Sequence, residues 1–266
     1  MAERYSTRRI LAWAVVPVLV LGAAAVLIGK SPGVHLTTAA VAADMTQAEF
    51  EQRVRNYLLE HPEVVGEAIR RLQAKQDAED AADTKVAFKA HTAEVFHDPD
   101  SPVGGNPDGN VTVVEFFDYN CPYCKMMAPL VTQAEAADPQ LRIVYKEFPI
   151  LGPGSVFAAK AALAAVKQGK YEAFHRALYQ VRGHVDEAKV LEVAGTVGLD
   201  VGRLKADMQD KAIEDDLTRN GELGQVLHIT GTPGFVVGDR VTTGAMDMTA
   251  FRSLIDDARK ANQATK

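Results

Sequence analysis

The sequence is poor in cysteine: Cys121 and Cys124 are its only two. Two thiols cannot form a disulfide framework, so the fold must depend on an apolar core. The chain also has no excess of basic residues, because its net charge is -6, and this excludes the electrostatic footprint of a nucleic-acid-binding protein. Its seven methionines do not cluster, which argues against a dedicated copper carrier. The composition, 47% hydrophobic and 24% charged, is that of a globular protein.

Charge is missing altogether from residues 10–28, which follow three arginines among the first nine residues. This arrangement predicts either an export signal or a membrane anchor. We therefore expect residues 1–43 to be a signal peptide, cut after the small residues 40–42, or an N-terminal membrane anchor with a tether. In both cases the rest of the chain is expected to be periplasmic or otherwise extracytoplasmic, and residues 10–28 would hold an uncut chain in the inner membrane.

Residues 44–90 are predicted to be a helical segment. Thr46 opens a capping box, and the step His61-Pro62 should end one helix and begin the next. The apolar residues follow helical spacing but are too few for such a segment to fold alone. Two alternatives stay open: the apolar stripe packs on the rest of the chain, or it packs on copies of itself, so that residues 45–90 make a homo-oligomer.

Residues 91–266 are predicted to form an α/β domain. A buried strand at 111–117 leads to the two cysteines, a helix begins at Cys121, and a second strand follows at 141–148. This order predicts a strand–helix–strand unit with a parallel pair of strands. Residues 97–110 are rich in turn formers and predict a loop.

The remainder of this domain is predicted to be helical and then to return to the sheet. Residues from about 153 to 227 indicate several helices. A hairpin is expected over 234–245, with its turn at Gly238-Asp239, and a last helix over 248–262.

Two cysteines separated by two residues suit a metal clip, a structural disulfide or a redox centre. A zinc site needs about four ligands, and no histidine shows ligand spacing near this pair. A linear Cu(I) site on two thiolates is chemically possible. A structural disulfide that closes so short a loop would stabilise the fold only weakly. We favour the redox centre and expect no metal and no cofactor.

The position of the pair at a helix start makes the two thiols unequal. The free amides and the dipole of a helix N-terminus stabilise an anion, and Cys121 stands there. Cys124 lies one turn inward and should be the less exposed thiol. An exposed thiolate attacks or is attacked, whereas the buried thiol releases the mixed disulfide.

A second feature lies far along the chain, where Thr232-Pro233 directly precedes a strand. A proline that enters a strand in this way suggests a cis peptide bond.

These features together resemble the DsbA-like branch of the thioredoxin superfamily. The resemblance rests on VEFF before Cys121-Pro122-Tyr123-Cys124, on the helical insertion and on the distant Thr232-Pro233, and covers roughly residues 90–266. The stretch NYLLEHPEVV resembles the N-terminal region of the ScsC-like subgroup, some members of which oligomerise through it and act as disulfide isomerases. The resemblance implies a thioredoxin fold with a helical insertion, preceded by an N-terminal helical segment.

The resemblance also implies the roles of the site residues. Cys121 would be the nucleophile and Cys124 the resolving thiol, while Pro122 and Tyr123 tune the thiolate. The loop at Thr232 and Pro233 would bind the backbone of the substrate.

Glu115 matches a buried acid beneath the active site of the family, which implies a proton relay for Cys124. The alternative is a buried or edge glutamate paired with a lysine such as Lys146.

The expected function is therefore an exported thiol–disulfide oxidoreductase acting on exported proteins that contain cysteine, with a membrane redox partner. Thr232 before the proline and the tyrosine of CPYC resemble isomerase and reductase members more than oxidases. The first alternative is a monomeric DsbA-type dithiol oxidase. The second belongs to another class: an exported Cu(I)-binding or chaperone-like protein.

Overall fold

The computed structural model describes residues 45–264, which fall into two units, one up to His61 and one from Pro62 onward. The predicted signal or anchor at 10–28 and the cleavage site at 40–42 lie outside the described residues. Within residues 45–264, no helix is both long enough and apolar enough to cross a membrane.

The first unit contains α1 (Gln47–Glu60). The predicted capping box is confirmed: the backbone amide of Glu49 donates to Thr46 Oγ1, and the Glu49 carboxylate accepts from the Thr46 amide at 3.0 Å. The predicted break is also confirmed, because α1 ends before His61 and α2 (Pro62–Ala90) begins at the proline. Neither helix has a buried residue.

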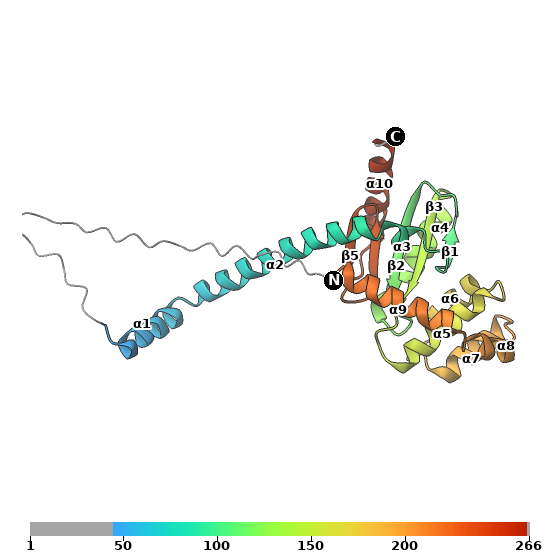
Figure 1. Ribbon diagram of the computed structural model, residues 1–266, viewed down its shortest axis with the longest axis horizontal. Coiled ribbons are helices and arrows are strands. Elements are labelled where there is room, and N and C mark those ends of the chain that lie inside the picture. The colour runs from blue at the N-terminus through green and yellow to red at the C-terminus, as the bar shows by residue number, and fades with distance from the viewer. Residues whose placement is uncertain (1–44, 265–266) are drawn as a thin grey trace, which may run out of the picture. The chain divides into compact units, whose positions relative to one another are not determined.

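The second unit is built on a five-stranded mixed sheet in the order β1-β3-β2-β4-β5 (Figure 1). The strands are β1 (Val103–Gly105), β2 (Val111–Phe117), β3 (Leu141–Glu147), β4 (Gly234–Val237) and β5 (Arg240–Thr243). The predicted parallel pair is confirmed as β2 and β3, and the predicted hairpin as β4 and β5. β4 runs antiparallel to β2, which brings the C-terminal hairpin next to the strand that leads to the cysteines.

The prediction of a plain loop over 97–110 is wrong in part, because β1 lies within it. This short strand pairs antiparallel with β3, with Gly104 opposite Ile143. A Cβ at Gly104 would lie 2.9 Å from the ring of Tyr145, so the glycine allows the close approach of this edge. Pairing with β3, rather than any strand propensity of Val-Gly-Gly, forms β1.

Successive side chains of β2 point to opposite faces of the sheet, and each face has its own apolar cluster. Val113 and Phe117 pack in the cluster that includes α4 (Pro122–Ala137), α6 (Tyr171–Tyr179) and α10 (Met248–Ala264). Val114 and Phe116 pack in the cluster on the other face, with α3 (Thr92–Phe96) and the end of α9 (Lys211–Val226). The cysteines belong to the first face.

The helices between β3 and β4 are α5 (Pro153–Val166), α6, α7 (Glu187–Thr196), α8 (Val201–Asp207) and α9. The first four of these gather in one helical group (Figure 1). α5 is its centre, because it contacts each of the others and buries all six of its alanines. α6 extends from this group toward α4 and so reaches the side of the sheet that holds the cysteines.

Candidate active site

Both cysteines lie at the start of α4, directly after β2. Cys121 is the N-cap residue, with extended backbone angles. Pro122 occupies the first turn, where the helix makes no hydrogen bond to the backbone N–H that proline lacks. Both thiols are free, and the exposed fraction is 4% for Cys121 and 0% for Cys124. Cys124 is therefore the more buried thiol, as predicted, but the expectation of an openly exposed Cys121 is wrong.

The burial of Cys121 comes from the loop before β4. The thiol of Cys121 donates to the carbonyl oxygen of Thr232 at 3.1 Å, across 111 positions of the chain. The Thr232-Pro233 peptide bond is cis, which confirms the sequence prediction. Gly244 donates its amide to the Pro233 carbonyl at 2.7 Å and so fastens the loop to the end of the hairpin. The fold thus brings together Cys121, Cys124 and the loop of Thr232 and Pro233.

Asp118 holds the turn between β2 and α4. Its carboxylate is 1% exposed, and one oxygen accepts from the amides of Ile150 and Leu151, each at 2.9 Å. The other oxygen accepts from the Asn120 amide and the Ser155 hydroxyl, each at 2.7 Å. Asp118 is a site residue that no sequence motif indicated. A polar residue directly after an apolar strand was the available signal.

Glu115 lies in the middle of β2 with 1% of its surface exposed. It is aligned with Tyr145 of β3, whereas Lys146 is aligned with Phe116 and therefore points to the opposite face of the sheet. The alternative pairing of Glu115 with Lys146 is accordingly wrong: Lys146 donates to Asp98 at 2.7 Å. Burial raises the pKa of Glu115 to about 8, and its Oε1 atom has no hydrogen-bond partner in the described protein.

The Glu115 carboxylate affects the ionisation of Cys124. Burial raises the pKa of the Cys124 thiol well above its usual range, and the nearby Glu115 carboxylate and Cys121 add to this effect. The Cys124 thiol therefore holds its proton more tightly than an exposed cysteine does. Glu115 points to the face of the sheet that holds Cys124, and its charge contributes to the raised pKa of this thiol.

Pro122 and Tyr123 lie on the solvent side of the pair. Both residues are exposed, and the side chain of Tyr123 is 58% exposed. Ile150 and Leu151, whose amides bind Asp118 beside Cys121, are also exposed apolar residues. The rim of the site is therefore apolar, although its interior holds thiols and a carboxyl group.

A second buried carboxyl group, Glu147, lies at the end of β3. Its Oε1 accepts from the hydroxyls of Tyr119 and Tyr171 at 2.8 and 2.9 Å, and Tyr119 also bonds His175 Nδ1 at 3.0 Å. Burial raises the pKa of Glu147 well above its usual range and lowers the pKa of His175 to about 3. His175 is therefore neutral at physiological pH, and this cluster joins α6 to the sheet without a net charge on the histidine.

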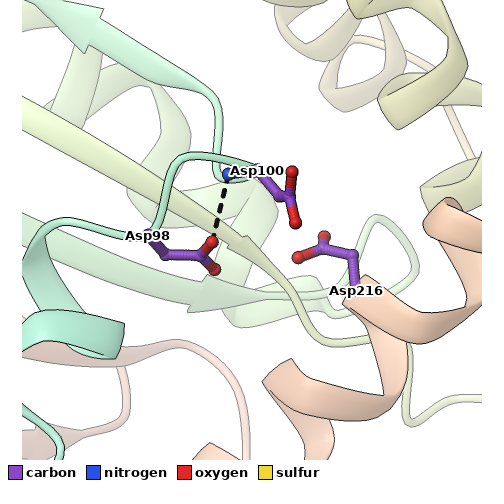
Figure 2. A group of neighbouring side chains, drawn as sticks. All are labelled: Asp98, Asp100 and Asp216. Atoms are coloured by element: carbon purple, nitrogen blue, oxygen red, sulfur yellow. Dashed lines mark hydrogen bonds between the residues drawn. The ribbon is translucent and has the colours of Figure 1, made fainter.

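Among residues 45–264, three carboxylates lie close enough to hold a cation: Asp98, Asp100 and Asp216 (Figure 2). Two cations of the protein already contact them. Lys146 binds Asp98 at 2.7 Å, while Arg219 binds Asp100 at 2.6 Å and Asp216 at 3.2 Å. We therefore assign this group to ion pairs that join the segment before β1 to α9 and β3.

Comparison with known proteins agrees with this geometry. Residues 112–256 match the family model of the DSBA-like thioredoxin domain, and residues 47–79 match that of the copper resistance protein ScsC N-terminal domain. The chain belongs to the DSBA-like thioredoxin domain family. The predicted thioredoxin fold with a helical insertion and an N-terminal helical segment is thus confirmed.

Solved structures of this family resemble the chain over most of their length. A thioredoxin-like oxidoreductase from Silicibacter pomeroyi DSS-3 is 49% identical, with a TM-score of 0.62, over 63% of this chain and 97% of that one. BcfH of Salmonella enterica Typhimurium is 31% identical, with a TM-score of 0.64, over 80% of this chain and 95% of that one.

Curated relatives match this chain over different shares of their own length. The thiol:disulfide interchange protein DsbA of Bordetella parapertussis is 27% identical over 59% of this chain and 77% of its own length. The first curated relatives are Na(+)/H(+) antiporters of Salinispora, which are 29% identical over 60% of this chain. The chain spans about a quarter of the length of those antiporters.

Proposed function

We propose that this chain is a thiol–disulfide oxidoreductase that exchanges disulfides with cysteine-containing proteins outside the cytoplasm. The observation that carries the proposal is the placement of Cys121 at the N-terminus of α4, with its sulfur 3.1 Å from the Thr232 carbonyl and Cys124 buried behind it. A helix N-terminus stabilises a thiolate, and a buried second thiol completes the exchange.

The reaction has two steps. In the first, the Cys121 thiolate attacks a disulfide of the substrate, forms a mixed disulfide and releases one substrate thiolate. In the second, Cys124 attacks the Cys121 sulfur, and its proton passes to the ionised form of Glu115, which is the minor form below about pH 8 because burial raises its pKa. The bond between Cys121 and the substrate breaks, the second substrate thiolate leaves, and the substrate is reduced while the pair is oxidised. An oxidase runs the same steps in reverse.

The rim of the site supports a polypeptide substrate. The Thr232 carbonyl accepts from the Cys121 thiol at 3.1 Å, so loss of this proton on reaction leaves an acceptor beside the sulfur with which an extended segment can pair. Tyr123, Ile150 and Leu151 offer exposed apolar surface to such a segment. This arrangement supports Thr232 and Pro233 as substrate-binding residues, and Pro122 and Tyr123 as residues that shape the environment of the thiolate.

The N-terminal segment favours an isomerase or reductase that works as a homo-oligomer. Phe50, Val54, Tyr57 and Leu58 lie at helical spacing on α1, and all four are exposed, which leaves an apolar stripe for contact with copies of this chain. Residues 47–79 also match the ScsC N-terminal domain. We propose that residues 45–90 associate, with residues 1–43 acting as the export signal or anchor and a membrane protein resetting the redox state of the pair.

Two alternatives have their own support. The likeness to DsbA supports a monomeric dithiol oxidase. The description of the ScsC N-terminal model as a copper resistance protein, together with two free thiols, supports Cu(I) binding or a chaperone-like role by an exported protein.

Two assays on the full chain separate these functions. Recovery of activity from ribonuclease with scrambled disulfides is expected for the isomerase, whereas rapid oxidation of a reduced peptide without such recovery would favour the oxidase. Reduction of insulin tests the general activity, and Cys121→Ser is the control. Absence of insulin reduction, peptide oxidation and ribonuclease recovery in the wild-type chain, with tight Cu(I) binding, would contradict the oxidoreductase.

A further inference from the structure

The loop over 181–185, in the connection between α6 and α7, is bound to the turn that carries the cysteines. Asn120, the residue before Cys121, bonds the backbone of Val185 in both directions. The Val185 amide donates to Asn120 Oδ1 at 2.7 Å, and Asn120 Nδ2 donates to the Val185 carbonyl at 3.0 Å. One end of the loop is therefore held next to Cys121.

The other end of the same loop is bound by the residue that follows the second cysteine. Lys125 comes directly after Cys124, and its Nζ donates to the carbonyl oxygens of Val181 and Gly183 at 3.1 and 2.7 Å. The two residues that flank the redox pair thus hold the two ends of one loop, which runs alongside the first turn of α4. A loop held in this way keeps a fixed position beside the reacting sulfur.

The apolar side chains of this loop point inward and the polar ones outward. Val185 is buried in the core cluster of the cysteine side, and Val181 packs against that cluster. Arg182 and His184 are exposed. The loop therefore presents a guanidinium group and an imidazole to solvent beside the redox pair.

The positive charge of this surface is not neutralised by carboxylates of the protein. Within residues 45–264, Arg182 makes no ion pair, and the hydrogen bonds of Lys125 go to neutral carbonyls. Other cations nearby are paired: Arg176 binds Glu135 at 2.8 Å. Arg182 and Lys125 are therefore the cations that remain for a bound molecule.

Two carboxylates follow the loop, and both belong to the start of α7. Asp186 is the N-cap residue of α7 and accepts from the Lys189 amide at 2.9 Å, and Glu187 lies in the first turn. The positive end of the helix dipole offsets such charges. The outward surface of the loop therefore keeps a positive charge.

Arg182 lies within reach of a polypeptide that reacts at Cys121. Each residue of a chain spans at most about 3.6 Å, so the backbone of Arg182 is no more than about 11 Å from that of Val185, which bonds Asn120 next to Cys121. An acidic side chain that is a few residues from the cysteine of a substrate can span this distance. The surface thus fits a substrate with negative charge close to its reacting sulfur.

We propose that the loop over 181–185 is part of the substrate-binding surface, and that Arg182 and Lys125 select polypeptides with aspartate or glutamate within about three residues of the reacting cysteine. The proposal rests on the thiol–disulfide exchange proposed above and adds the class of substrate. The chain as a whole has a net charge of -6 and would repel an acidic polypeptide. A preference for acidic substrates must therefore come from a local surface such as this one.

The test compares three peptides that differ only in charge. Each has one cysteine joined to pyridine-2-thiol by a disulfide, with glutamate, glutamine or lysine at the neighbouring positions on both sides. The Cys121 thiolate of the reduced full chain attacks the peptide sulfur and forms a mixed disulfide. The pyridyl disulfide breaks, and the leaving thiolate takes up a proton and is followed by its absorbance.

The wild-type chain should react with the glutamate peptide about tenfold faster than with the lysine peptide at low salt, because complementary charge raises association rates by about tenfold or more. The glutamine peptide should react at a rate between these two. At about 1 M salt, where the Debye length is about 3 Å, the ratio of the glutamate rate to the lysine rate should fall toward one.

Substitutions at Arg182 should change this ratio. Arg182→Gln should lower it to about threefold, and Arg182→Glu should lower it to about one or less. Arg252→Gln is the matched control, because Arg252 is also an exposed arginine but lies near Ala137 and Asp138, at the end of α4 away from the cysteines. This control should keep the wild-type ratio. A ratio of two rates from one sample does not depend on the fraction of the protein that is folded.

Three results would overturn the acidic preference: a wild-type ratio of one or less, a wild-type ratio in Arg182→Glu, or an equal loss of the ratio in Arg252→Gln and Arg182→Gln. A wild-type chain that releases no pyridine-2-thiol from any of the three peptides would instead contradict the proposed function. The two failures are therefore distinguishable.

Discussion

The sulfur of Cys121 and the carbonyl oxygen of Thr232 lie 3.1 Å apart, although 111 positions of the sequence separate the two residues. The contact exists because β4 pairs with β2, and each strand delivers its residue to the same end of the sheet. A substrate sulfur that reacts with Cys121 must therefore arrive beside the Thr232 backbone. The reaction and the binding of an extended polypeptide are thus coupled by sheet geometry.

The first prediction concerns the division of roles between the thiols. Cys124→Ser should accumulate mixed disulfides with substrate proteins, because Cys121 still attacks but no second thiol releases the adduct. Cys121→Ser should form none. Non-reducing gel electrophoresis of material from cells that make each variant measures this. Equal accumulation in both variants would contradict the assignment.

The second prediction follows from the buried carboxyl group of Glu115. Its pKa is about 8 in the folded protein against an ordinary value of 4.5, so the folded state holds a proton that the unfolded state loses between these values. The wild-type protein should therefore lose stability as the pH rises from about 4.5 to 8, by a few kcal/mol, since one pKa unit corresponds to about 1.36 kcal/mol.

Glu115→Gln keeps the shape of the side chain but removes the group that titrates. Its free energy of unfolding, relative to wild type, should therefore rise across this pH range and level off above it. Urea titrations at pH 4.5, 6.5 and 8.5 provide the measurement. A constant difference between the two proteins at all three values would show that Glu115 does not hold its proton in the fold.

Much of this arrangement follows from local pattern. The β-branched strand before Cys121, the proline in the first turn of α4 and the proline before β4 predict the sheet, the helix start and the cis peptide bond. Each of these depends on a few neighbouring residues and on backbone constraints that are local in sequence.

The features that the sequence did not reveal depend on pairing between distant segments. Lys146 stands one residue beyond the position aligned with Glu115, and a shift of one residue moves a side chain to the other face of a sheet. Three of the four hydrogen bonds of Asp118 come from residues more than thirty positions away in the sequence. The fourth comes from Asn120 in the same turn, and its sequence does not differ from that of an ordinary polar loop. The burial of Cys121 likewise depends on the Thr232 carbonyl.

The third prediction concerns Asp118. Replacement by alanine leaves the amides of Ile150 and Leu151 and the Ser155 hydroxyl without their acceptor, and bonds to a charged group contribute about 1.5–3 kcal/mol each. Asp118→Ala should lower the free energy of unfolding by about 3 kcal/mol or more, measured by urea titration. Asp108→Ala, at an exposed aspartate, should change it by about 0.5 kcal/mol or less. Equal effects of the two substitutions would contradict the role given to Asp118.

The last prediction tests the apolar stripe of α1. Phe50 and Tyr57 are both 53% exposed on one face of a helix that buries none of its side chains, and a helix with so little buried surface is not stable alone. If copies of the chain cover this face, Phe50→Glu combined with Tyr57→Glu should convert the oligomer to a monomer, as measured by light scattering on the full chain. Gln52→Glu, on the polar face of α1, is the control and should leave the mass unchanged. The monomer should keep its reaction with insulin, because the thiols lie in the other unit, but should lose recovery of scrambled ribonuclease if isomerisation needs several sites in one assembly.

A wild-type mass equal to that of a single chain would contradict the oligomer and favour the monomeric oxidase.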